Sequence, residues 1–173
     1  VNRRGSVDLG IKSLAGSREA NSLILDSALK IMGKNGYALL VDHGLSTARK
    51  FAAEIEKRPL FELVTRPQLN ILTYRICPPH LKQAVLEGNE AKKAAAVEAL
   101  NEINRTVQRR QRESGKSFVS RTTLMRRPDE RGIVVLRSVI MNPMTTMDIL
   151  NDILDEQEDI YGKYFPETES FSF

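Results

Sequence analysis

The chain has 173 residues, of which 41% are hydrophobic and 28% charged, so it is long enough to bury the core of one ordinary domain. Its formal net charge is +4, and the 26 basic and 22 acidic residues are interspersed, a balance that does not by itself require nucleic acid. The single cysteine, Cys77, excludes an intrachain disulfide and fits a reducing cytosol.

Apolar side chains at helical spacing predict two helices in the first third of the chain. Residues 1–17 contain turn residues without periodicity and begin with valine rather than methionine, so we expect a connecting arm of a longer polypeptide. The first helix is predicted over residues 18–33, with Gly33 as a stop signal, and the second over residues 36–57. The apolar stripes expected to face a core comprise Leu23, Leu25, Ala28, Leu29 and Met32, then Leu39, Leu40, His43, Ala48, Phe51, Ala52 and Ile55.

Four later segments are rich in strand-forming residues and read as two pairs of strands. Residues 61–65 and 69–76 flank a turn-like segment that contains a proline. Residues 117–125 and 132–141 flank the charged segment 126–131, which we interpret as a hairpin loop. Hairpin-joined strands of this kind predict antiparallel pairing within each pair.

Two more helices complete the order of elements, one over residues 89–114 and one beginning after a cap at Thr145 or Thr146. Helices inserted between strand pairs predict an α+β fold, with an antiparallel or mixed sheet of about four strands covered by helices on at least one face. We expect residues 18–165 to form this domain and residues 166–173 to form a tail.

No catalytic, metal-binding or cofactor-binding set of residues can be assembled from the sequence. His43 and His80 are far apart and lack partners at the spacing of metal ligands. Cys77 lies at a strand end beside two prolines, and we interpret it as a small apolar residue at a sheet edge. Glycine-rich phosphate-binding motifs are also missing from the sequence. The chain by itself therefore does not resemble a complete enzyme.

Localisation and nucleic-acid binding can be judged from the same residues. No apolar run approaches the roughly 18 residues of a membrane span, and no signal peptide is visible, so a cytoplasmic protein without a membrane partner is expected.

Arg105, Arg109 and Arg112 form one helical stripe that could bind RNA phosphates. Glu102 and Glu113 dilute this stripe, and the strands lack interleaved aromatics, so a solvated helix face is the favoured interpretation.

Three arginines interrupt otherwise apolar strands: Arg75, Arg121 and Arg137. A guanidinium cannot lose its charge, and leaving it buried without a partner costs several kcal/mol. Each arginine either pairs inside the chain, with Glu62, Asp8 or the acidic last helix as candidates, or points out of the sheet toward a substrate carboxylate. From the residues alone the pairing interpretation is favoured for any one of them.

Three stretches carry a resemblance to a known family: FELVTRPQLNILTYRICPP, SGKSFVSRTTL and VVLRSVIMNPMTTMDILNDIL. In order and spacing they resemble the C-terminal part of the group II pyridoxal-phosphate-dependent decarboxylases, and the resemblance spans most of residues 18–161. It implies the fold of the C-terminal domain of fold-type I pyridoxal-phosphate enzymes. The similarity of the opening residues to a bacterial branch of the family implies aspartate or glutamate as the substrate.

The resemblance also implies how the work is divided within the full-length protein. The family holds pyridoxal phosphate on a lysine that follows a histidine, and neither histidine here precedes a lysine, so we expect an inactive C-terminal fragment without bound cofactor. The full-length protein would be a homodimeric carboxy-lyase, in which the cofactor accepts the electrons left by departing carbon dioxide. Arg137 matches the arginine of the family's "LR…NP" motif, which implies a contact with a substrate carboxylate. Arg18 is a looser match to a basic segment.

A binding module remains the alternative to a decarboxylase fragment. One form of it is a stand-alone RNA-binding domain that uses the stripe from Arg105 to Arg112. The other is an oligomerisation module, since apolar surface left uncovered on a fragment favours self-association.

Overall fold

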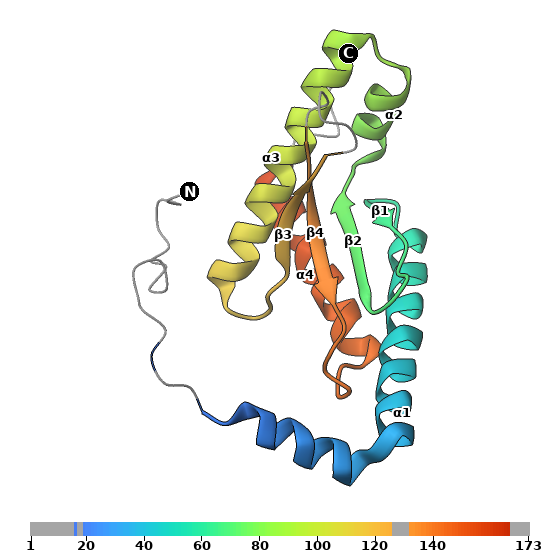
Figure 1. Cartoon of the computed structure of the whole chain (residues 1–173). Coiled ribbons are helices and arrows are strands. Elements are labelled where there is room, and N and C mark those ends of the chain that lie inside the picture. Colours follow the sequence, from blue (N-terminus) through green and yellow to red (C-terminus); the bar gives the residue numbers. More distant parts are fainter. Residues whose placement is uncertain (1–15, 17–18, 126–131, 167–173) are drawn as a thin grey trace. The chain divides into compact units, whose positions relative to one another are not determined.

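The structure is a computed structural model, and it describes residue 16, residues 19–125 and residues 132–166 (Figure 1). The chain divides into two compact units at the boundary between Leu39 and Leu40. We describe each unit by itself. The predicted loop at 126–131, the N-terminal arm to residue 15 and the tail from residue 167 lie outside the described residues.

The described part of the first unit consists mainly of the first half of helix α1, which runs from Asn21 to Lys57. The backbone of Gly33 leaves helical geometry inside this helix, with φ 61° and ψ −177°, a conformation that glycine adopts without a Cβ penalty. The predicted stop at Gly33 is therefore a kink, after which the helix resumes. The predicted stripe is not buried, because Leu23 and Leu25 are 65% and 56% exposed. A helix buries a stripe only where another element covers it, and the described residues of this unit include no other helix or strand.

The second half of α1 belongs to the second unit, and its buried face begins later than predicted. Leu39, Leu40 and His43 were predicted to be buried, and this prediction was wrong, since all three are exposed. The residues of α1 in the core cluster begin at Ala48. The buried residues of the helix recur at steps of three and four: Gly44, Thr47, Ala48, Phe51, Ala52 and Ile55.

The second unit is built on a four-stranded sheet whose order is β1-β2-β4-β3. The strands are β1 (Phe61–Thr65), β2 (Ile71–Ile76), β3 (Ser120–Leu124) and β4 (Ile133–Val139). This order places β2 and β4 at the centre of the sheet and β1 and β3 at its edges (Figure 1). All three pairings are antiparallel. The predicted α+β class and the four predicted strands are confirmed.

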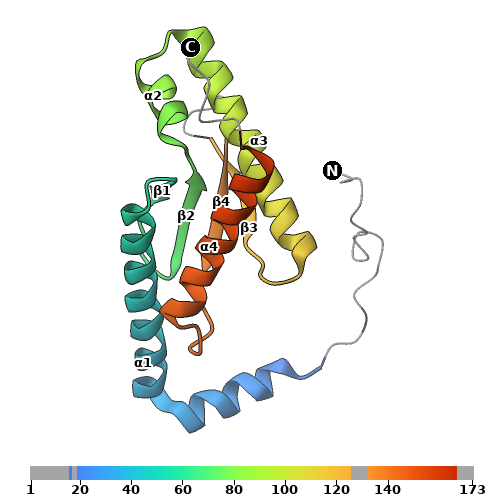
Figure 2. The ribbon, with the colours of Figure 1, turned by 180° about the vertical axis from the view of Figure 1, so that it is seen from behind.

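Besides the second half of α1, three helices accompany this sheet, and one of the three was not predicted. Helix α2 (Pro79–Glu87), which was not predicted from the sequence, has proline at its first position, where the missing N–H is not needed. Helix α3 (Glu90–Ser114) is capped by Asn89 and ends at Gly115, whose φ is 72°. Helix α4 (Met147–Tyr164) crosses the sheet and is capped by the Thr146 hydroxyl (Figure 2).

The two faces of the sheet have different roles. Alternation places Leu72, Tyr74 and Ile76 of β2 on the same face as Leu136 of β4, and all four belong to the core cluster. Their partners from the helices are Phe51, Ile55, Leu100, Ile103, Val107, Leu150 and Leu154. The opposite face carries Thr73, Arg75, Val135 and Arg137, so the strand arginines of β2 and β4 lie away from this core.

Four amide side chains connect α3 to the rest of the second unit. Asn101, Asn104, Gln108 and Gln111 recur at steps of three and four on one helix face, and all four are buried. The Asn101 amide donates to the Gly132 carbonyl over 3.0 Å and accepts from the Val134 N–H over 2.7 Å. Buried amides of this kind are tolerated because backbone groups satisfy them.

Candidate functional site

Arg137 lies on the central strand β4, directly opposite Thr73 of β2 on one side and Ser120 of β3 on the other. Its side chain is exposed, unlike those of Val135 and Leu136 just before it. The Arg137 Nε donates a hydrogen bond to the Ser120 hydroxyl over 3.2 Å. Among the described residues, no carboxylate pairs with this guanidinium. Its two terminal nitrogens make no hydrogen bond to a described residue.

Thr73, the other neighbour of Arg137, is turned toward β1. Its hydroxyl lies 2.7 Å from that of Thr65, and the Thr65 hydroxyl also accepts from the Thr73 N–H over 3.0 Å. The register of β1 against β2 shifts between Leu63 and Thr65, which brings Thr65 opposite Thr73. Among the described residues, the side-chain hydrogen bond of Arg137 is therefore to Ser120 of β3 and not to Thr73.

Arg75, on the same sheet face, has the structural role that sequence reasoning favoured. It is 5% exposed, and its Nε donates to the Glu62 carboxylate over 2.5 Å. Glu62 was among the predicted partners, and the register of β1 against β2 places it directly opposite Arg75. The Arg75 Nη1 is buried without a hydrogen-bond partner, which makes the Glu62 contact the main compensation for this buried charge.

Arg121 also makes a contact inside the chain. Its Nη1 donates to the backbone carbonyl of Arg105 on α3 over 3.2 Å. Of the three strand arginines, Arg75 is buried against Glu62 and Arg121 is half-buried against the backbone of α3, whereas Arg137 is exposed and has no carboxylate partner among the described residues. The sequence alone did not distinguish them, because all three occur in similar apolar runs.

Cys77 and the histidines do not form a reactive centre in the described residues. Burial raises the pKa of the Cys77 thiol to about 11, with Arg75 acting in the opposite direction and Glu62 raising it further. The thiolate that nucleophilic chemistry requires is therefore disfavoured at neutral pH. No group of three potential metal ligands occurs within the described residues, where His43 is exposed and His80 lies at the start of α2.

The described residues do not fit a pyridoxal-phosphate site. The second unit has an apolar pocket of about 290 Å³ at one end of the sheet, lined by Leu40, Val41, Gly44, Leu45, Leu69, Asn70, Ile140 and Met141. This lining offers no lysine to carry the cofactor, no acidic residue for a pyridine nitrogen and no basic residue for a phosphate. We therefore derive no reaction step through the cofactor from this chain.

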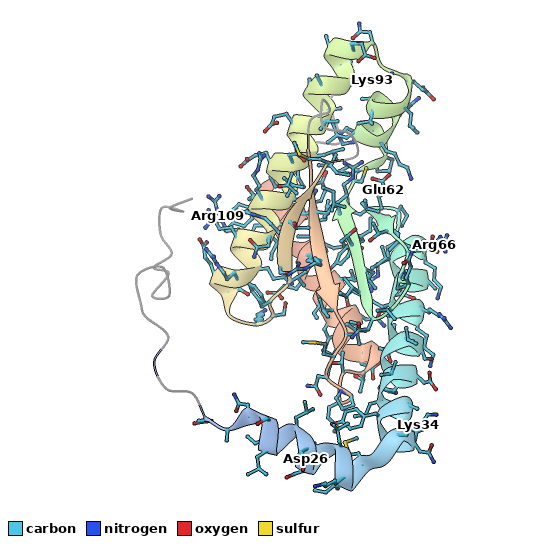
Figure 3. The ribbon with its side chains drawn as sticks, viewed as in Figure 1. Asp26, Lys34, Glu62, Arg66, Lys93 and Arg109 are labelled. Carbon is cyan, nitrogen blue, oxygen red and sulfur yellow. The ribbon has the colours of Figure 1, made fainter. Side chains whose placement is uncertain are left out.

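The basic stripe on α3 is partly neutralised. Arg105 pairs with Glu98 over 2.9 Å and with Glu102 over 3.6 Å, whereas Arg109 projects outward from the helix (Figure 3). This arrangement favours the solvated-face interpretation over RNA binding. Within the described ranges no helix has the length and apolarity to cross a membrane. Arg18 lies outside the described residues.

Comparison with known proteins identifies relatives by sequence. No family model matches the chain. It is 39% identical over 159 residues to aspartate 1-decarboxylase of Aliivibrio fischeri, an alignment that covers 91% of this chain and 29% of that enzyme. It is 27% identical over 154 residues to the aromatic-L-amino-acid decarboxylase of Bacillus atrophaeus, covering 89% of this chain and 28% of the relative.

Solved structures share the fold. Mouse CSAD in its apo form superposes with a TM-score of 0.68 at 22% identity, covering 83% of this chain and 28% of that chain. Oryza sativa TDC, solved with PLP and tryptamine, gives a TM-score of 0.61 at 18% identity, covering 80% of this chain and 26% of that chain. The chain thus spans less than a third of the length of each of these four proteins. In sequence and fold it corresponds to the C-terminal, domain-sized region of the group II pyridoxal-phosphate-dependent amino-acid decarboxylases.

Proposed function

We propose that this chain is the C-terminal part of a pyridoxal-phosphate-dependent carboxy-lyase that acts on aspartate or glutamate, and that Arg137 binds a substrate carboxylate. One observation carries the role of Arg137. Of the three strand arginines it is the exposed one without a described carboxylate partner, whereas Arg75 is paired with Glu62. It also occupies the position of the arginine in the "LR…NP" motif of the family. The aspartate 1-decarboxylase relative supports an acidic substrate.

The chemistry of Arg137 suits this role. A guanidinium keeps its charge at any physiological pH, and its planar fork binds both oxygens of a carboxylate, which fixes orientation as well as position. A central strand is a rigid support for such a group. The contribution of this chain to catalysis would be to bind and orient the substrate, while the groups that carry the cofactor lie in the remainder of the enzyme.

Several further properties belong to the same proposal. We infer that the chain alone is inactive and holds no cofactor, and that the full-length enzyme is a cytoplasmic homodimer that binds neither nucleic acid nor membrane. Residues 18–165 would form the small domain, preceded by an arm at 1–17 and followed by a tail at 166–173. The partly neutralised stripe on α3 supports the expectation about nucleic acid.

Carbon dioxide release tests the proposed activity. The full-length protein is assayed with aspartate, glutamate, diaminobutyrate and an aromatic amino acid, with and without added pyridoxal phosphate. Release from aspartate or glutamate that depends on the cofactor is the expected result. Release from none of the four substrates would overturn the proposed reaction, and release only from the aromatic amino acid would overturn the proposed substrate class.

A further inference from the structure

Ser120 makes two hydrogen bonds to the same residue on the neighbouring strand. Its hydroxyl donates to the Arg137 carbonyl over 3.0 Å and accepts from the Arg137 Nε over 3.2 Å. A hydroxyl has one proton to give and lone pairs to receive, so both bonds form at the same time. One side chain thus fixes the backbone and the guanidinium of Arg137 together.

The position of Ser120 is itself held from both sides. The residue before it, Val119, is buried, and its carbonyl accepts from the Gln108 side chain of α3 over 3.2 Å. The residue after it, Arg121, donates to the Arg105 carbonyl of the same helix over 3.2 Å. The start of β3 is therefore anchored to α3 immediately on each side of Ser120.

The bond to Nε restricts how Arg137 can bind a carboxylate. A guanidinium binds a carboxylate side-on, through Nε and one terminal nitrogen, or end-on, through both terminal nitrogens. Ser120 occupies Nε, and Thr73 on the opposite side is engaged with Thr65 instead. Only the end-on fork remains open.

From this geometry we infer that Ser120 is a positioning residue, which holds Arg137 so that its two terminal nitrogens bind a substrate carboxylate end-on. The inference rests on the proposed role of Arg137 in a decarboxylase. Ser120 itself need not touch the substrate. Its effect on the reaction passes through the orientation of the guanidinium.

A first test probes the hydrogen bond between the Arg137 Nε and the Ser120 hydroxyl and does not depend on enzymatic activity. In this 173-residue chain, the exchange of the Arg137 Nε proton with water is followed by nitrogen-15 NMR. Ser120→Ala should accelerate that exchange at least about fivefold, because the acceptor of the proton is lost. Ser120→Thr keeps a hydroxyl and suits a strand, so it should restore slow exchange. The matched control is Thr122→Val, which removes a hydroxyl from the same face of β3 opposite Val135 and should leave the exchange unchanged.

A second test measures the consequence in the full-length enzyme. With L-aspartate as the probe, Ser120→Ala should raise KM about tenfold while kcat changes less, and Ser120→Thr should recover most of the loss. Unchanged Nε exchange in Ser120→Ala would overturn the inference, and so would equal losses in the alanine and threonine variants. If the wild-type enzyme released no carbon dioxide but the Arg137 Nε proton exchanged as expected in the variants, the proposed reaction would be wrong, whereas the hydrogen bond from Arg137 to Ser120 would be confirmed.

Discussion

Asn104 of α3 replaces the missing β4 partner of Ile76, the last residue of β2, which pairs with Phe61 of β1 on its other side. Its side-chain oxygen accepts from the Ile76 N–H and its amide nitrogen donates to the Ile76 carbonyl, both over 2.9 Å. The ladder between β2 and β4 ends at Tyr74 opposite Leu136, two residues earlier. In an antiparallel ladder the partner of Ile76 would be Val134, whose N–H bonds instead to Asn101. Two amides of one helix therefore complete the hydrogen bonding of two central strands where the strands separate.

Asn104→Ala should lower the free energy of unfolding by about 3 kcal/mol, because it leaves both backbone groups of Ile76 buried without partners. Urea denaturation of the chain measures this loss. The matched control is Asn89→Ala, which removes the exposed cap of the same helix and should cost only about 1 kcal/mol. Equal losses for the two variants would show that Asn104 contributes no more than an ordinary cap.

Glu62→Gln should destabilise the fold by about 2 to 3 kcal/mol, because it leaves the buried charge of Arg75 without a counter-ion. The side chain of Glu62 is 24% exposed, which keeps this loss of stability below that expected for a fully buried ion pair. A control pair has the same 2.5 Å contact on the surface, between Arg66 and Glu56, whose side chains are 77% and 40% exposed. Glu56→Gln should change the free energy of unfolding by less than about 0.5 kcal/mol. Comparable effects of the two substitutions in urea denaturation would contradict a buried role for the Arg75 pair.

Alkaline pH should destabilise the fold through two buried groups. Burial raises the pKa of Tyr74 from 10.0 to about 12, opposed by hydrogen bonds from Gln157 and Ser138, and the pKa of Cys77 from 9.0 to about 11. Between the unfolded and folded pKa values the unfolded chain loses these protons first, so it binds fewer protons than the folded chain. The free energy of unfolding therefore is at its full value below about pH 9 and falls as the pH rises toward 12.

The contribution of Tyr74 can be isolated in a Cys77→Ala background. Unfolding free energies at pH 9 and pH 12 should differ by about 2 kcal/mol more in this variant than after Tyr74→Phe is added. The phenylalanine variant should be less stable overall, because Gln157 loses one of its two hydrogen-bond partners and keeps Gln111. Its free energy of unfolding should change less between pH 9 and pH 12. A difference that persists in full after Tyr74→Phe would assign the alkaline transition to other groups.

The sequence predicted those parts of the fold that depend on local signals. Asn89 and Gly115 mark the ends of α3 because a side-chain cap and a left-handed glycine act within a few residues. The bounds of β1 follow from alternation within five residues. Helix α2 escaped prediction because Pro79 signals both the end of a strand and the start of a helix, and the choice depends on packing against α3.

The tertiary features were beyond local reasoning. Asn101 and Asn104 look like ordinary polar residues of a helix, and only the separation of β2 and β4 gives them buried partners. Burial of the predicted α1 stripe is confirmed from Ala48 to Ile55 and was wrong for Leu23, Leu25, Leu39, Leu40 and His43, because periodicity identifies an apolar face without identifying what covers it. The sequence identified three strand arginines as candidates for the site. Only the register of β1 against β2, which pairs Glu62 with Arg75, shows that Arg75 has a carboxylate partner, whereas Arg137 has none among the described residues.

The most direct test of the account compares Arg137→Lys with the wild type in the full-length enzyme. Decarboxylation of L-aspartate and the free energy of unfolding are measured on the same preparations. The account predicts that kcat/KM falls about 100-fold, because an ammonium cannot reproduce the bidentate fork. The free energy of unfolding should change by less than about 0.5 kcal/mol, because the side chain is exposed. Unchanged decarboxylation, or a loss of activity matched by a comparable loss of folding stability, would contradict a substrate-binding role for Arg137.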